Sequence, residues 1–123
     1  MRIVEGGICA VRGVKASGIK DGRNGVALFT GGGQAAGVFT TNKVTAAPVI
    51  VTREHLKQSN EILAIVANSG SANAFTGPEG VNDAKSVAKS LAQRLHIRDT
   101  QVAVASTGVI GTPLNKDLSL IHI

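Results

Sequence analysis

The chain contains very little cysteine and very few aromatic residues. Cys9 is the only cysteine, so no disulfide can form within the chain and no cysteine-based zinc site is available. There are three Phe and neither Tyr nor Trp. Single-strand nucleic-acid binders stack bases on aromatic side chains, so this scarcity argues against that class of protein. The core must be built from Ala, Val, Ile and Leu.

The sequence also lacks an apolar run suited to a membrane or a signal peptide. Residues 1–5 have no long apolar stretch, and the uncharged window 25–42 holds five Gly with Thr and Gln, which makes a poor membrane span. We therefore expect a cytoplasmic protein with no membrane partner. The net charge is +5, but Lys and Arg are scattered, so a nucleic-acid partner is not expected.

Hydrophobic residues make up 43% of the chain, and their pattern changes between its two parts. The first part predicts a strand at 13–20, a turn at 21–25 and a strand at 26–29. A glycine break at 31–33 separates this last strand from its antiparallel partner at 36–41. A buried strand at 48–52 and one or two helical turns at 53–59 follow. The second part predicts a strand at 62–67 that is buried on both faces, a helix at 81–95 and a strand at 101–106.

A strand, a long helix and another strand in succession indicate a parallel, right-handed βαβ unit. Thr76 and Glu79 have the spacing of a capping box at the start of the helix. No linker divides the chain. The fold class is therefore α/β, with a mixed sheet flanked by helices.

Three loops rich in small residues are candidate sites. Residues 31–37 match no nucleotide-binding pattern and predict a hairpin connection. The Asn and Ser side chains of 68–77 have two open roles: binding a polar ligand or satisfying the loop's own backbone. In 106–111, the Thr107 hydroxyl and the Gly108 N–H are two adjacent donors that suit an oxyanion hole. Taken alone, an ordinary strand-to-turn junction is the commoner explanation of such a segment.

Histidines and acids give no sign of a metal site. His55, His96 and His122 are far apart in the sequence, and we expect them at the surface or at helix ends. No pair of acidic residues is closely spaced. We expect neither a metal nor a cofactor.

Taken together, five ordered blocks resemble the N-terminal part of the ornithine acetyltransferase (glutamate N-acetyltransferase) family of arginine biosynthesis. The blocks are Gly13–Lys20, Ala36–Asn42 with Val44 and Ala46–Val49, Asn68–Ala74 with Thr76 and Gly77, Asp83–Ala84, and Ser106–Gly111 with Leu114. The resemblance implies that residues 1–123 are the N-terminal part of an α chain, whose fold is incomplete without a C-terminal β chain.

The resemblance also implies a mechanism. The family's precursor cuts itself before a Thr, which becomes the N-terminal nucleophile of the β chain and uses its own amino group as base. An acetyl-threonine intermediate carries the acetyl group from N-acetylornithine to glutamate, with acetyl-CoA an open alternative donor. The family's stabilising Thr-Gly pair aligns with Thr107 and Gly108. The two chains form heterodimers that assemble further, into a heterotetramer.

The chain departs from the family in lacking the self-cleavage segment and the nucleophile. By itself it is therefore expected to be inactive and to expose apolar surface that the β chain would cover. The alternative is a truncated, non-catalytic remnant that acts as an interaction module. A third reading, a small basic nucleic-acid binder, would require salt-dependent binding to DNA or RNA.

Overall fold

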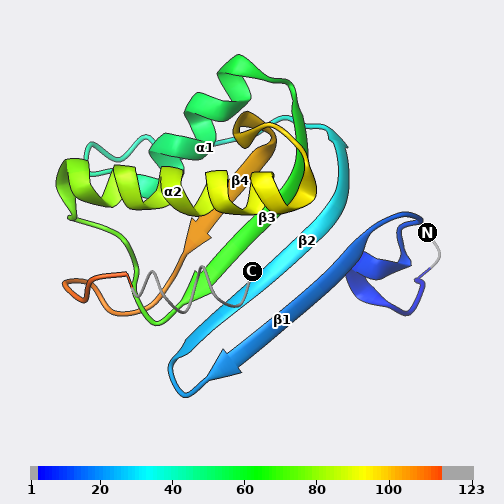
Figure 1. Cartoon of the computed structure of the whole chain (residues 1–123), viewed down its shortest axis with the longest axis horizontal. Helices are drawn as coiled ribbons and strands as arrows, with labels where there is room; N and C mark the ends of the chain where they lie inside the picture. The colour runs from blue at the N-terminus through cyan, green and yellow to red at the C-terminus, as the bar shows by residue number, and fades with distance from the viewer. Residues whose placement is uncertain (1–2, 115–123) are drawn as a thin grey trace.

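The computed structural model describes residues 3–114, which form one four-stranded sheet with two α-helices (Figure 1). The strands are β1 (Lys15–Asp21), β2 (Asn24–Gln34), β3 (Glu61–Ser69) and β4 (Val102–Ser106). The helices are α1 (Ala47–Gln58) and α2 (Gly77–Leu95), with short 3-10 helices η1 (Gly7–Ala10) and η2 (Asp99–Gln101). The strand order is β1-β2-β3-β4; β3 and β4 are parallel and the other pairs are antiparallel. The predicted mixed α/β sheet is confirmed.

The first hairpin forms where the sequence predicts it. Asp21 pairs with Asn24, so only Gly22 and Arg23 connect β1 to β2. Gly22 has a φ of 56°, a conformation that glycine adopts without steric cost. The turn prediction for residues 21–25 is therefore confirmed.

The glycine run does not end the second strand, contrary to the prediction. β2 continues to Gln34, with a register shift between Thr30 and Gly33. A Cβ atom on Gly31 would collide with the carbonyl of Gly13, and one on Gly32 with the carbonyl of Ile62. The glycines therefore let neighbouring backbones approach closely at a bulge.

The predicted partner strand at 36–41 is also wrong. These residues form no strand, and β2 pairs instead with β3. The hairpin expected at 31–37 is absent for the same reason. The partner comes from a segment farther along the chain, which the local pattern could not reveal.

The buried strand predicted at 48–52 is instead the first part of α1. Its β-branched residues favour a strand locally, but Pro48 fits the first helical turn, where no N–H is needed. The helical spacing places Val51 in the core and turns Thr52 and His55 toward β4. Tertiary contacts thus override local propensity.

The βαβ unit is present, because α2 connects the parallel strands β3 and β4. The predicted helix at 81–95 lies within α2, and its apolar stripe is buried at Ala84, Val87, Ala88 and Leu91. The capping box is wrong: the Thr76 hydroxyl makes no cap and donates to Asn73 Oδ1 at 2.7 Å. No helix within residues 3–114 is both long and apolar enough to span a membrane.

Both α-helices pack on one face of the sheet, over β3 and β4, whereas β1 and η1 stand away from them (Figure 1). Along β3, buried residues alternate with more exposed ones. Ile65 is 37% exposed, whereas its neighbour Val66 is 1% exposed. The prediction that this strand is buried on both faces is therefore wrong for this chain.

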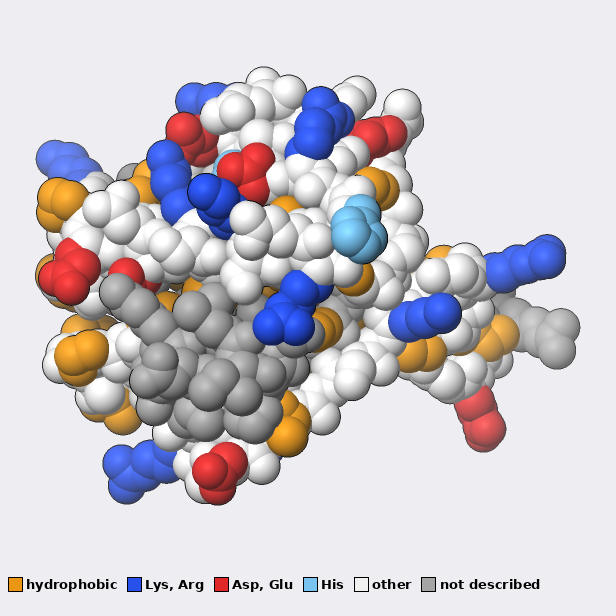
Figure 2. Space-filling view, in the orientation of Figure 1, with side chains coloured by type: hydrophobic (Ala, Val, Ile, Leu, Met, Phe, Trp, Pro, Cys, Tyr) orange, Lys and Arg blue, Asp and Glu red, His pale blue; other side chains and the backbone are white. Residues whose placement is uncertain are grey.

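The face without helices, called the open face, carries small and apolar side chains at the inner positions of its strands. Strand alternation and register assign to it Ala27, Phe29, Leu63, Ile65, Ala67, Ala103 and Ala105. An apolar hollow of about 410 Å³ lies at one end and is lined by Phe29, Leu63 and Ile65, together with Phe39 and Leu56. Where described residues are visible on the helix-bearing side, charged side chains of both signs are interspersed (Figure 2).

Candidate functional site

The second and third candidate loops lie side by side at one edge of the sheet. Residues 68–74 span the end of β3 and the beginning of the loop after it, and residues 106–111 do the same for β4. Because β3 and β4 are parallel, both loops leave the sheet at the same edge. Loops at the carboxyl ends of adjacent parallel strands commonly form binding sites.

Backbone hydrogen bonds join the two loops beyond the strand ends. The Thr107 N–H donates to the Asn68 carbonyl at 3.0 Å, and the Val109 N–H donates to the Gly70 carbonyl at 3.1 Å. The Ala72 N–H returns a bond to the Val109 carbonyl, also at 3.1 Å. The parallel ladder therefore continues into the loops and fixes their relative position.

Thr107 and Gly108 are both exposed directly after β4. The N–H groups of Thr107 and Val109 both point toward the β3 side, so the intervening Gly108 N–H is directed away from it. Within residues 3–114, neither the Thr107 hydroxyl nor the Gly108 N–H has a hydrogen-bond partner. Two adjacent donors are thus available to a ligand at this edge.

Gly108 occupies a place that no other residue could fill. Its φ is 135°, and a Cβ atom there would collide with the carbonyl group of Gly70. The close contact with Gly70 therefore requires glycine and leaves the Gly108 N–H unshielded by a side chain.

The polar side chains of the second loop mainly satisfy backbone groups. Asn68 Nδ2 donates to the Ser71 carbonyl at 3.2 Å, and Asn73 Nδ2 donates to the Gly80 carbonyl at 3.0 Å. The Ser71 hydroxyl donates to the Pro113 carbonyl at 2.9 Å, and the Ser69 hydroxyl to the Arg23 carbonyl at 3.2 Å. Of the two open roles, the structure supports satisfaction of the chain's own backbone.

The first candidate loop lies elsewhere. Gly33 pairs with Ile62 at the start of β3, whereas Asn68 is near the end of that strand. Residues 31–37 therefore lie at the opposite end of the sheet from Thr107 and contribute nothing to the paired loops.

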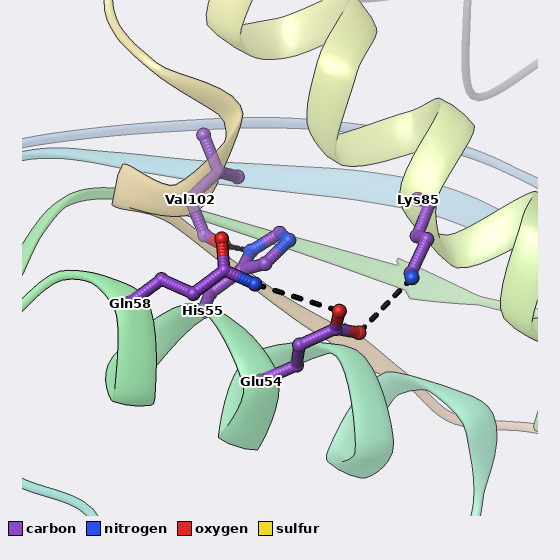
Figure 3. Close-up of polar contacts among 5 residues, drawn as sticks. All are labelled: Glu54, His55, Gln58, Lys85 and Val102. Atoms are coloured by element: carbon purple, nitrogen blue, oxygen red, sulfur yellow. Dashed lines mark hydrogen bonds and ion pairs between the residues drawn. The ribbon is translucent and has the colours of Figure 1, made fainter.

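The two histidines within residues 3–114, His55 and His96, lie at the ends of different helices. His55 lies in the last turn of α1, but it is 5% exposed and so not at the surface. Figure 3 shows its Nδ1 facing the Val102 carbonyl at 2.8 Å, while neighbouring Glu54 lies between Gln58 and Lys85. A carbonyl only accepts, so Nδ1 donates and ties α1 to β4. His96 ends α2 as predicted, and His122 is outside the described residues.

Acidic residues within the described part of the chain also show no metal-binding arrangement. No group of three His, Cys, Asp or Glu residues there could hold a metal ion. Glu54 pairs with Lys85 at 3.0 Å, and Glu61 Oε2 accepts a bond from Gln101 Nε2 at 3.0 Å. These contacts give both acidic residues a structural role.

Two hydroxyl groups to which the sequence analysis gave no role organise this region. Thr52 bonds both backbone groups of Val104, and Ser106 donates to Asn68 Oδ1 at 2.5 Å. In the sequence, Thr52 shows only as a hydroxyl in an otherwise apolar stretch, and Ser106 only as the first residue of the third candidate loop. Their roles follow once the strand register is known.

A four-stranded mixed sheet with two hydrogen-bonded loops at one edge defines a class of α/β protein, and comparison with known proteins specifies the family. The ArgJ family matches residues 11–123. Over 123 residues the chain is 54% identical to a glutamate N-acetyltransferase of Methanosarcina mazei, covering all of this chain and 31% of that protein. Over 119 residues it is 50% identical to one of Methanothermobacter thermautotrophicus, covering 94% of this chain and 29% of that protein.

Solved structures agree. The arginine biosynthesis bifunctional protein argJ of Bacillus halodurans superposes with a TM-score of 0.86 at 37% identity, over 92% of this chain and 62% of that one. An ornithine acetyltransferase of Mycobacterium tuberculosis, complexed with ornithine, gives a TM-score of 0.82 at 37% identity, over 89% and 63%. The chain therefore belongs to the ArgJ family, which confirms the resemblance. It spans less than a third of these curated relatives.

Proposed function

We propose that this chain is the N-terminal part of an acetyltransferase that moves an acetyl group from N-acetylornithine to glutamate. The observation that carries the proposal is a pair of donors at the end of β4, the Thr107 hydroxyl and the Gly108 N–H, which have no hydrogen-bond partner within residues 3–114. Relatives that are named glutamate N-acetyltransferase support the chemistry, as does the neighbour that was crystallised with ornithine.

In the proposed reaction, the nucleophile is the N-terminal Thr of a second polypeptide, released by self-cleavage. Its hydroxyl attacks the acetyl carbonyl while its amino group takes the proton. The carbonyl oxygen becomes an oxyanion, which Thr107 and Gly108 stabilise by donating hydrogen bonds. The C–N bond then breaks, ornithine leaves with the proton, and the amino group of glutamate attacks the acetyl-threonine ester to regenerate the hydroxyl. Acetyl-CoA would acylate the same Thr with loss of the thiol.

The proposed partner is a C-terminal polypeptide that packs on the open face. Two observations support it: the open face is apolar yet not covered by either helix, and the chain spans only 31% of the Methanosarcina mazei relative. Burial of apolar surface of this kind is the main driving force of obligate association. Further assembly of such pairs into a heterotetramer belongs to the same proposal.

The test starts with the intact mass of the purified protein under denaturing conditions, because a second polypeptide beginning with Thr would identify a processed enzyme. This chain is then joined, in place of the matching 123 residues, to the remainder of the Methanosarcina mazei relative; we call this the complete enzyme. It should transfer acetyl groups from N-acetylornithine to glutamate. Absence of transfer would contradict the proposal and favour a non-catalytic interaction module.

The role of Thr107 is tested in the complete enzyme. Thr107→Ala should lower kcat by about 100- to 1000-fold, the usual effect of removing one oxyanion donor. Thr107→Ser keeps the hydroxyl and should retain most of the activity. Thr41→Ala, at an exposed threonine between β2 and α1, serves as the control. Turnover by Thr107→Ala at the unsubstituted rate would exclude the proposed role.

A further inference from the structure

One polar pair, a buried Asn68 and a half-buried Ser106, interrupts the apolar contact between β3 and β4. On the helix-covered face, the two preceding pairs of strand partners are apolar and buried: Ala64 with Val102, and Val66 with Val104. The next pair is Asn68 with Ser106, and Asn68 is 6% exposed. Two apolar residues would fill this place without the desolvation penalty of polar groups. The polar pair therefore contributes less to stability than to the orientation of the two strand ends.

Asn68 directs its polar groups toward the neighbouring loops. Its Oδ1 accepts from the Ser106 hydroxyl at 2.5 Å, and its Nδ2 donates to the Ser71 carbonyl at 3.2 Å. Its backbone carbonyl accepts from the Thr107 N–H at 3.0 Å. Asn68 is thus bonded both to Ser106, the last residue of β4, and to Thr107, which follows it.

We propose that Asn68 and Ser106 are positioning residues, whose mutual hydrogen bond sets the place of Thr107 and Gly108. The inference rests on the proposed function, since it concerns the same pair of donors. Hydrogen bonds from a neutral amide and a hydroxyl have fixed lengths and angles, so they hold the end of β4 in one register against β3. An apolar contact would permit sliding.

A second contact limits the loop from its other side. Gly108 lies directly against the backbone of Gly70, two residues beyond Asn68 in the chain. The Val109 N–H then bonds to the Gly70 carbonyl. Thr107 and Gly108 are therefore held between the Asn68–Ser106 bond and the Gly70 contact, which leaves their free donors little room to move.

The kinetic test uses the complete enzyme and removes only one hydroxyl. Ser106→Ala should lower kcat by about 10-fold, because displacement of oxyanion donors by a fraction of an ångström weakens catalysis. KM for N-acetylornithine should change by less than about 2-fold, since the donors act in the transition state. Ser106→Thr restores the hydroxyl and should restore kcat, and Asn68→Ala should behave like Ser106→Ala.

The matched control is Ser59→Ala. Ser59 is a buried serine whose hydroxyl bonds the backbone of Glu61, whereas Ser106 is half-buried; Ser59 precedes β3 at the opposite end of the sheet. It should lower stability without lowering kcat. An unchanged kcat in Ser106→Ala, or an equal loss in Ser59→Ala, would overturn the inference, as would failure of Ser106→Thr to restore activity.

A second measurement does not depend on activity. Hydrogen exchange of the peptide that contains residues 105–111 should become faster in Ser106→Ala, since the Thr107 and Val109 N–H groups lose their fixed acceptors. Ser59→Ala should leave it unchanged. Unchanged exchange in Ser106→Ala refutes the positioning role even if acetyl transfer is absent. Slow turnover by Thr107→Ala, with normal turnover by Ser106→Ala and Asn68→Ala, refutes the inference alone and leaves the proposed function standing.

Discussion

The hydroxyl of Thr52 bonds the backbone of β4 along the edge that pairs with no other strand within residues 3–114. The Val104 N–H donates to Thr52 Oγ1 at 3.0 Å, and Oγ1 donates to the Val104 carbonyl at 3.1 Å. His55 bonds the Val102 carbonyl on the same edge. Side chains of α1 therefore occupy backbone groups that would otherwise be unpaired at an edge strand. Thr52→Val keeps the shape of the side chain and removes both bonds.

The expected loss can be worked out from these contacts. Leaving one buried backbone group without a partner costs about 1–3 kcal/mol. Val104 is 7% exposed, but Thr52 is half-buried, so water can partly compensate and the low end applies. For the two groups together we expect a decrease in the free energy of unfolding of about 2 kcal/mol. Thr and Val differ little in helix propensity, so this term hardly changes the value.

The assay is equilibrium urea unfolding of the complete enzyme, followed by circular dichroism. Thr52→Ser keeps the hydroxyl and should recover more than half of the loss, and Thr41→Val at an exposed site should be neutral. A Thr52→Val protein within about 0.5 kcal/mol of the unsubstituted one would refute the reasoning, because that range is typical of surface changes without structural role.

Two further predictions concern the open face and the start of α2. Ile65→Lys places a charge on the open face and should reduce self-association of the isolated chain in light scattering. In the complete enzyme a partner would bury this charge, so the free energy of unfolding in urea should fall by at least about 3 kcal/mol. No change in either measurement would mean that nothing covers this face. Gly80→Ala would normally stabilise a helix by about 1 kcal/mol. Here the new Cβ would collide with Thr76 Oγ1 and Asn73 Oδ1, so the melting temperature should fall, whereas Lys89→Ala on the exposed side of α2 should change it little; a rise for Gly80→Ala would contradict the collision.

The second part of the fold was predictable because its signals are local. The apolar stripe of α2 and the apolar runs on either side of it contain the βαβ unit within one stretch of chain. In the first part only the hairpin of β1 and β2 was predictable, because its turn signal is local; the segment from residue 31 to α1 was not, because its outcome depends on distant partners. Residues 49–52 have strand-forming side chains but lie in a helix, in which Thr52 and His55 bond the edge of β4. Gly31 and Gly32 suggest a break, but they permit close contact with Gly13 and Ile62.

The candidate site was also predictable only in part. Thr107 and Gly108 were singled out from the sequence and from family resemblance, whereas their fixed geometry comes from the neighbouring strand. No local pattern links Asn68 to Ser106, which are 38 residues apart. Their contact follows only from the parallel register of β3 and β4. Register therefore determines which hydroxyls matter.

The alternation of β4 connects the candidate site to the open face. Val102 and Val104 point toward the helices, and Ala103 and Ala105 point to the open face. Thr107 continues the second row, one step beyond the end of the strand. A polypeptide that covers the open face would therefore also reach the Thr107 side chain. In the proposed function, covering the sheet and bringing the proposed nucleophile to Thr107 and Gly108 would then be one event. Substitutions such as Ile65→Lys should then reduce acetyl transfer together with assembly, without any change to Thr107 itself.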